Sequence, residues 1–345
     1  MNYRTGQEMT FLATEKEMIP LMEKMSGHYK QAAQEIIREL QRIYGKYLTT
    51  TDPQDYYNIM IQSARNNRLL EQVQGIYSEY SKAAAKDLGD ISKLAMSNTY
   101  YRNQYMLTWF TPAEINLSFS ILDPKLIELT VSGTDVAWSA IKKAMDEVTA
   151  RQYMPAYGTL KNLLKRNEVN DLVKIQQTIT QAFINGHSID DLSSNIKGVF
   201  DTAQYQAERI AQTEFTRCSN AGDFAATQDA ADQGLNVQKM WCATLDDKTR
   251  ESHQELDGQI VGIDEPFVTS DGQEALFPGD FVDAAETCNC RCTTITLVDG
   301  DMPELRRGRD PESGENEVFS YQKYDDWMYS KGFDKDESGK WVKAN

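Results

Sequence analysis

The stretch VQKMWCATLDDKTRESHQELDGQIV, residues 237–261, marks where this 345-residue sequence changes from helical patterns to strand patterns. Its first residues favour a strand, because Val, Trp, Cys and Thr suit a half-buried pleated surface. Asp257 and Gly258 then give a tight-turn signal ahead of a second apolar run. Two further strand candidates are GQIVGIDEPFV at 258–268 and CRCTTITLV at 290–298. Together these segments predict a small α+β domain over 187–299 with short antiparallel strands.

The sequence before this domain has the pattern of helices. Apolar residues recur at steps of three and four over 20–48, a stripe typical of an amphipathic helix. We expect that helix to start at Pro20, because a first helical turn does not need the missing N–H. Farther on, Ser188 and Asp191 resemble a capping box. The predicted fold class is therefore a mainly α-helical N-terminal region, 1–186, followed by the small α+β domain.

The segment 300–345 is polar and charged, with aromatic residues spaced along it. Its first part, DGDMPELRRGRDPESGENE, has the composition of a linker. We expect a tail that either docks its Tyr, Trp and Phe side chains or stays partly disordered.

The composition limits the function classes that need consideration. Hydrophobic residues make up 40% and charged residues 26% of the chain, which is typical of a soluble globular protein. The formal net charge of −16 argues against nucleic-acid binding through the overall field, since phosphate affinity comes from Lys and Arg. We expect neither a signal peptide nor a membrane span, and the five cysteines form a poor disulfide framework.

A polar motif lies in the segment AERIAQTEFTRCSNAG, residues 207–222. Glu214 and Arg217 are three apart, close enough to pair on a helix, and Thr213 and Asn220 follow along much the same side. One interpretation is a surface ion pair of small energy. The other is a polar face that ties this helix to the strands of the small domain.

A second motif combines Arg250, His253 and Asp257 at spacings of three and four. On a helix these residues line one side, where a carboxylate can orient an imidazole. The alternative is a structural network whose hydrogen bonds are satisfied internally. A cysteine–histidine hydrolase would pair His253 with a thiol, but the sequence has no distinctive nucleophile motif.

The cysteines in TCNCRC form the third motif. On an extended chain Cys288, Cys290 and Cys292 point to one face, because strand side chains alternate. With His253 as a fourth ligand they suit zinc by ligand type, although this spacing is less suitable than the usual CxxC loops. The alternative is a set of buried free thiols that pack as small hydrophobic groups. We expect no cofactor, with zinc as the alternative.

The order of three segments resembles the phage head morphogenesis family, the Mu protein F-like minor head proteins of tailed bacteriophages. They are AERIAQTEFTRCSNAG, KMWCATLDDKTRESHQELDGQIV and FPGDFVDAAETCNCRC, and the resemblance covers about 188–297. The structural-motif residues are Thr213, Glu214, Arg217, Asn220, Trp241, Asp247, Arg250, His253, Asp257, Gly258, Cys290, Arg291 and Cys292.

The resemblance implies a structural capsid protein rather than an enzyme, present in few copies and added during procapsid assembly. Implied partners are the phage portal protein, other capsid or scaffolding proteins and packaged DNA, with no membrane. The implied location is the virion head interior or portal vertex, and the host cytoplasm during assembly. The helical region 1–186 is the candidate portal-docking or capsid-docking part. A role in DNA packaging or ejection is a further expectation.

The chain departs from the family pattern at its cysteines and histidines. Some members carry a CxxC and a later HPxCRC, which together resemble a zinc site. Here RESH replaces the CxxC and leaves His253 at its second cysteine, while Thr287 stands at the later histidine position. Hydrogen bonds and ion pairs are expected to hold this corner instead of a metal.

Two other function classes stay open from the sequence. One is a phage-delivered enzyme or toxin that uses His253 with Arg250, Asp257 or a cysteine. The other is a DNA-binding module at the portal. Its local basic residues are Lys161, Lys165, Arg166, Arg306, Arg307 and Arg309.

Overall fold

The computed structural model describes residues 3–44, 63–111, 115, 117–118, 121–132, 160–185 and 188–344. The chain divides into two compact units. A helical unit comprises Met18–Ile91 and Gly158–Ala211. A mixed unit comprises Met1–Glu17, Ser92–Tyr157 and Gln212–Asn345. The predicted fold class is confirmed, because helices precede a region of short antiparallel strands.

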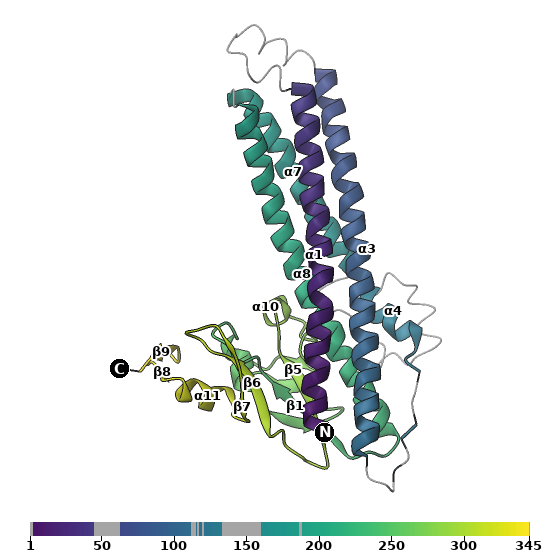
Figure 1. Ribbon diagram of the computed structural model, residues 1–345, viewed down its shortest axis with the longest axis vertical. Helices are drawn as coiled ribbons and strands as arrows, with labels where there is room; N and C mark the ends of the chain where they lie inside the picture. The colour runs from purple at the N-terminus through teal and green to yellow at the C-terminus, as the bar shows by residue number, and fades with distance from the viewer. Residues whose placement is uncertain are drawn as a thin grey trace. The chain divides into compact units, whose positions relative to one another are not determined.

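Parts of four long described helices form the helical unit (Figure 1). They are α1 (Tyr3–Tyr44), α3 (Ser63–Phe110), α7 (Leu160–Asn185) and α8 (Ile189–Asp232). Each presents an apolar stripe to a shared core, which includes Ile36, Leu88, Ile179 and Phe200. Burying one such side chain stabilises the bundle by about 1.5–3 kcal/mol relative to exposure. The helical period of the sequence therefore reflects side chains that pack against neighbouring helices.

The predicted helix over 20–48 is confirmed in its stripe but wrong in its start. Met25, Tyr29, Ala32, Ile36 and Leu40 are all buried, as the pattern predicts. The helix begins at Tyr3, however, and Pro20 lies inside it. Proline removes one backbone hydrogen bond from a helix interior, and the helix continues past it with Met18 and Met25 buried on either side. Positions 45–48 lie outside the described residues.

The capping box at the start of α8 is confirmed. The Ser188 Oγ accepts a hydrogen bond from the Asp191 backbone N–H at 3.1 Å. In return the Asp191 carboxylate accepts from the Ser188 backbone N–H at 3.2 Å. These two bonds satisfy N–H groups that have no partner within a helix, which fixes where α8 begins.

An antiparallel sheet of the order β2-β1-β5 lies at the centre of the mixed unit. Its strands are β1 (Val237–Cys242), β2 (Ile260–Gly262) and β5 (Thr293–Val298). Each lies within a segment predicted as a strand. The other described elements of this unit are α4 (Pro124–Ser132), α9 (Glu251–Leu256), β3 (Phe267–Val268), β4 (Glu274–Ala275), α10 (Ala284–Thr287), β6 (Leu305–Arg309), β7 (Asn316–Ser320), α11 (Tyr324–Ser330), β8 (Phe333–Lys335) and β9 (Trp341–Lys343).

The C-terminal part of α8 contacts this sheet and the C-terminal part of α3. The hydroxyls of Thr227 and Thr296 lie 2.8 Å apart, which joins α8 to β5. The Asn103 amide of α3 donates to the Asp223 carbonyl of α8 at 3.2 Å. Gly222 lies so close to α3 that a Cβ added there would be 2.2 Å from the Met96 carbonyl oxygen. Only glycine allows α3 and α8 to pack at this separation.

The segment 300–344 is an ordered part of the mixed unit. It forms the hairpins β6–β7 and β8–β9 with α11 between them. Tyr324, Trp327 and Met328 are buried in the same core cluster as Trp241 and Phe281. Of the two alternatives for this segment, the structure shows the docked one, because its aromatic side chains complete a core. The domain boundaries at 186 and 299 stay predictions.

None of the described helices is both long enough and apolar enough to cross a membrane.

Candidate functional site

The Glu214–Arg217 pair of α8 is buried, so the surface interpretation is wrong. The two residues are 1% and 2% exposed, and Arg217 Nη2 lies 2.8 Å from Glu214 Oε2. The same guanidinium donates to the Thr130 carbonyl at the end of α4. A buried guanidinium needs both charge compensation and hydrogen-bond acceptors, and this arrangement supplies them. The pair therefore fixes α4 against α8.

The other two residues of the motif hold the loops that lead into β5. The Asn220 amide donates to the carbonyl oxygens of Pro278 and Cys292, at 3.1 and 3.0 Å. The Thr213 hydroxyl accepts from the Asn289 backbone N–H at 2.9 Å. These contacts show the second alternative from the sequence, a polar face that ties the helix to the strand region.

The turn formed by Pro278, Gly279 and Asp280 passes directly over this face of α8. Gly279 has a φ of 97°, and a Cβ there would lie 3.0 Å from the Arg217 Cα and Cβ atoms. Glycine meets both demands, a left-handed backbone and a close approach to the helix. The Asp280 carboxylate closes the turn by accepting from the Leu276 N–H at 2.9 Å, and burial raises its pKa to about 7.

Arg250, His253 and Asp257 do not form one network, although their spacing suggested it. Arg250 precedes α9 and donates to the carbonyl oxygens of Ala285 and Cys288. Arg250 and His253 both approach the Glu286 carboxylate, whereas Asp257 points to Arg306. The helix has only six residues, so its two ends direct their side chains into different surroundings.

Asp257 is the centre of a buried network that joins three segments. Its carboxylate accepts hydrogen bonds from both terminal nitrogens of Arg306, at 2.6 and 2.7 Å. It also accepts from the backbone N–H groups of Ala243, at 2.8 Å, and Tyr324, at 2.7 Å. Asp257 and Arg306 are 6% and 5% exposed. Arg306 is therefore not available for phosphate contact, contrary to its place among the candidate DNA-binding residues.

His253 faces two cysteine thiols in the interior. Its Nδ1 lies 3.6 Å from Cys290 Sγ and 3.4 Å from Cys292 Sγ. The three residues are 2–3% exposed. Rings of Trp241 and Phe281 lie against the imidazole, with centroids 5.1 and 5.7 Å away. The structure thus gathers one imidazole and two thiols in the interior, beside two aromatic rings.

Glu286 lies on the other side of the imidazole, and no sequence motif pointed to this residue. Its Oε2 is 3.0 Å from His253 Nε2. The approach is an ion-pair distance rather than an aligned hydrogen bond, since Nε2 has no aligned hydrogen-bond partner among the described residues. Ser252 Oγ donates to the same carboxylate at 2.7 Å and helps to hold it. The carboxylate beside His253 is therefore Glu286 and not Asp257.

Cys288 lies outside this cluster, contrary to the expectation that all three cysteines share one face. The chain turns at Asn289, which has a φ of 57°, and regular strand begins only at Thr293. Alternation holds between Cys290 and Cys292 but not across that turn. Among the described residues, His253, Cys290 and Cys292 form a group of possible metal ligands. Their donor atoms all lie within 4.8 Å of one another.

Asp246 is a second residue that the sequence interpretation missed. Its carboxylate pairs with both terminal nitrogens of Arg291 and accepts from the Lys248 N–H at 3.0 Å. Asp247, the predicted motif residue, is exposed. Gly258 has a φ of 76°, as its turn position requires, and the Gly258 N–H donates to the Trp241 carbonyl at 2.9 Å. Two adjacent acidic residues cannot be told apart by spacing alone.

The sequence of this chain matches known proteins of one family. Residues 173–295 match the family described as Phage Mu protein F like protein. The minor head protein GP7 of Bacillus phage SPP1 is 30% identical over 269 residues, which cover 77% of this chain and 79% of that protein. This chain belongs to the Phage Mu protein F-like family of minor head proteins. The resemblance inferred from the three motif segments is confirmed.

Two other relatives are similar to this chain over only part of their length. The NAD(+)–arginine ADP-ribosyltransferase EFV of Enterococcus faecalis is 39% identical over 153 residues, covering 44% of this chain and 30% of the enzyme. The uncharacterized protein YqbB of Bacillus subtilis is 29% identical over 146 residues, covering 41% of this chain and 47% of that protein. The chain thus spans less than half of either relative. No solved structure matches it.

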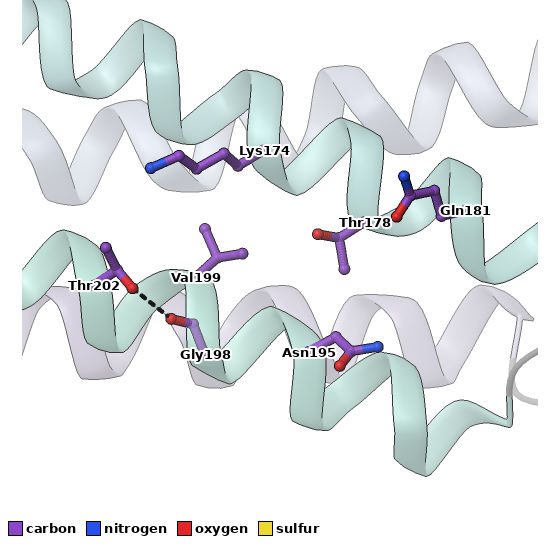
Figure 2. A pocket seen from close by; sticks show the side chains of 7 residues that line it. All are labelled: Lys174, Thr178, Gln181, Asn195, Gly198, Val199 and Thr202. Carbon is purple, nitrogen blue, oxygen red and sulfur yellow. Dashed lines mark hydrogen bonds between the residues drawn. The ribbon is translucent and has the colours of Figure 1, made fainter.

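A groove in the helical unit of this Mu F-like protein has a volume of about 480 Å³ (Figure 2). Its lining comes from Lys174, Thr178 and Gln181 of α7 and from Asn195, Val199 and Thr202 of α8. The groove holds amides, hydroxyls and one ammonium group, without a carboxylate or a histidine. It lacks the paired acid and base that hydrolytic chemistry needs.

Burial of Asp223 in α8 predicts a pH-dependent stability. Burial raises the pKa of Asp223 to about 7, while a hydrogen bond from the Thr294 hydroxyl at 3.0 Å opposes the shift. An unfolded aspartate has a pKa of about 4, so this group favours folding less as pH rises from about 4 to 7. We expect the Asp223→Asn variant to lose less stability between pH 5 and pH 8 than the wild-type protein, measured by urea unfolding.

A matched control for that measurement is Asp271→Asn. Hydrogen bonds from the side chains of Thr269 and Gln273 lower the pKa of the exposed Asp271 carboxyl. That group is ionised in both the folded and unfolded states across this pH window, so its removal should leave the pH dependence unchanged. Equal pH dependence of the Asp223→Asn variant and the wild-type protein would contradict the assignment.

Proposed function

We propose that this chain is a minor head protein of a phage virion that associates with the portal during procapsid assembly. The observation that carries the proposal is its 30% identity to the minor head protein GP7 over 77% of the chain. The proposed location is the virion head interior or portal vertex, after assembly in the host cytoplasm. Other capsid or scaffolding proteins and packaged DNA are further proposed partners, with a role in packaging or ejection.

The use of the motif residues supports a structural role. Arg217, Asn220 and Asp257 each bond the backbone carbonyls or N–H groups of other segments. Such contacts define a fold, whereas a catalytic side chain must reach a substrate. His253, Cys290 and Cys292 are all at least nine-tenths buried. Neither set presents a reactive group to solvent, which agrees with a protein that works by assembly.

The helical unit is the proposed docking part. Val169 and Val173 of α7 are 54% and 46% exposed and lie four apart, on one side of the helix. Tyr205 of α8 is 62% exposed. Apolar groups left in water on a bundle contribute binding free energy when a partner covers them. We propose that the portal protein contacts α7 at Val169 and Val173.

Co-expression with the cognate portal protein tests the proposal. We expect the two proteins to co-purify at low salt, and the chain to be detected by mass spectrometry in purified virions. The double variant Val169→Lys/Val173→Lys is expected to weaken recovery, because it places charge in an apolar contact. Asn185→Lys, at an exposed polar position on another side of the same helix, is the control and should bind normally.

Failure to co-purify at low salt, together with absence from virions, would contradict the proposal. Normal binding by the double lysine variant would leave portal association standing and would reject the docking surface on α7.

An enzymatic role is the second candidate, favoured by the partial identity to the transferase EFV. It predicts that the purified chain releases nicotinamide from NAD⁺ in the presence of an arginine-containing acceptor. The structural proposal predicts no release above a buffer control. If release occurs and His253→Ala abolishes it while circular dichroism is unchanged, the enzymatic candidate replaces the structural one.

A further inference from the structure

The imidazole and thiols described above have the spacing of donors around one metal ion. In tetrahedral zinc sites, Zn–N bonds of about 2.0 Å and Zn–S bonds of about 2.3 Å place nitrogen and sulfur about 3.5 Å apart. The two distances from His253 Nδ1 to the thiols of Cys290 and Cys292 are 3.6 and 3.4 Å. Both agree with that separation, so one ion between the three atoms requires little movement of their side chains.

We propose that His253 Nδ1 and the thiolates of Cys290 and Cys292 bind one thiophilic cation, for which zinc is the probe. Softness of the two sulfur ligands selects zinc or copper(I) over magnesium or calcium. Binding forms two metal–sulfur bonds and one metal–nitrogen bond, and the two thiol protons leave to solvent. Two thiolates neutralise a divalent ion, so the ion and its three ligands together carry no net charge and avoid the cost of an unpaired charge. Three protein donors leave one coordination position for a further ligand.

Glu286 is the positioning residue of this site. Metal-bound histidines usually direct their second ring nitrogen to a carboxylate, which fixes the tautomer and the ring orientation. Glu286 Oε2 lies 3.0 Å from Nε2, on the opposite side of the ring from the two thiols. Contacts from Ser252 and Arg250 hold the carboxylate, at 2.7 and 4.0 Å. The ligand atom Nδ1 thus faces the sulfurs because the other nitrogen faces a carboxylate.

The fold separates this ligand set from the alternative that includes Cys288. That residue is the C-cap of α10, and the left-handed turn at Asn289 separates it from the other two cysteines. The Cys288 backbone carbonyl accepts a hydrogen bond from Arg250, which fixes the position of its peptide group. Cys288 therefore offers a control thiol two residues from a ligand, in the same sequence motif but outside the cluster.

Metal analysis of the purified full-length chain tests the proposal directly. The protein is treated with a chelator and a thiol reductant, then titrated with zinc and, separately, with cobalt(II). We expect one zinc per chain after gel filtration, and a thiolate-to-cobalt charge-transfer band in the cobalt spectrum. We also expect zinc to raise the midpoint of urea unfolding, since a ligand that binds the folded state stabilises it. Absence of stoichiometric zinc and of the cobalt band in the wild-type protein overturns the proposal.

Four variants test the ligand set. Cys290→Ser and Cys292→Ser are expected to lose the cobalt band, whereas Cys288→Ser keeps it at full intensity. Glu286→Gln should keep the band but weaken affinity by about 10–100-fold. If circular dichroism shows that a ligand variant is unfolded, the proposal is judged from the cobalt spectrum of the wild-type protein and from Cys288→Ser and Glu286→Gln. Loss of the band in Cys288→Ser, or unchanged zinc affinity in Glu286→Gln, overturns the assignment of the corresponding residue.

Discussion

Asp257→Ala is expected to lower the free energy of unfolding by about 3–5 kcal/mol, because it leaves a buried guanidinium without its counter-charge. The Asp257 carboxylate accepts four hydrogen bonds, two of them from Arg306. The substitution also removes the acceptor of two buried backbone N–H groups, those of Ala243 and Tyr324. Equilibrium urea unfolding, followed by circular dichroism, measures the change.

The control for this prediction is an exposed ion pair of the same unit. Glu312 and Lys343 have side chains 54% and 68% exposed, so Glu312→Ala should change stability by less than about 1 kcal/mol. Asp257→Ala/Arg306→Met should be more stable than Asp257→Ala alone, because it removes the unpaired charge as well. A loss for Asp257→Ala no larger than that for Glu312→Ala would contradict the role of the buried pair.

Gly222→Ala is expected to destabilise the protein by about 3 kcal/mol or more, as overpacking against backbone does when neither side can move aside. The new Cβ would be 2.2 Å from the Met96 carbonyl oxygen and 3.1 Å from its carbon. Helix propensity alone predicts the opposite sign, since alanine is favoured over glycine by about 1 kcal/mol in a helix. The sign of the measured change therefore shows whether the close contact between α3 and α8 outweighs helix propensity at this position.

Gly198→Ala in the same helix is the matched control. A Cβ at that position meets nothing within 4 Å, so propensity acts without a clash. We expect this variant to be more stable than the wild-type protein by up to about 1 kcal/mol, in the same urea measurement. Stabilisation by both substitutions would show that α3 and α8 do not pack closely at Gly222.

Local patterns in the sequence predicted the features that depend on neighbours in the chain. The stripe from Met25 to Leu40 and the capping box of Ser188 are properties of single helices, so periodicity finds them. Pro20 misled the prediction of the helix start, because proline is common in a first turn and its place inside α1 depends on packing. The strands were found for the same reason, from β-prone residues between turn signals.

The candidate site was predictable only in part, because its partners are distant in sequence. Alternation correctly placed Cys290 and Cys292 together, but it failed for Cys288, where a left-handed residue interrupts the extended chain. The carboxylate beside His253 is Glu286, and no periodicity relates those positions. Spacing likewise suggested Asp257 as the partner of His253, whereas the fold pairs it with Arg306.

The four hydrogen bonds at Asp257 have a consequence for synthesis of the protein. During translation the ribosome releases Trp241 and the strands around it before it has made Tyr324 and Trp327, which complete the same core. Domains generally fold as units during synthesis. A nascent chain ending near Val298 would therefore hold Asp257 without Arg306 and would leave aromatic rings uncovered. The mixed unit is expected to remain a chaperone substrate until α11 has emerged from the exit tunnel.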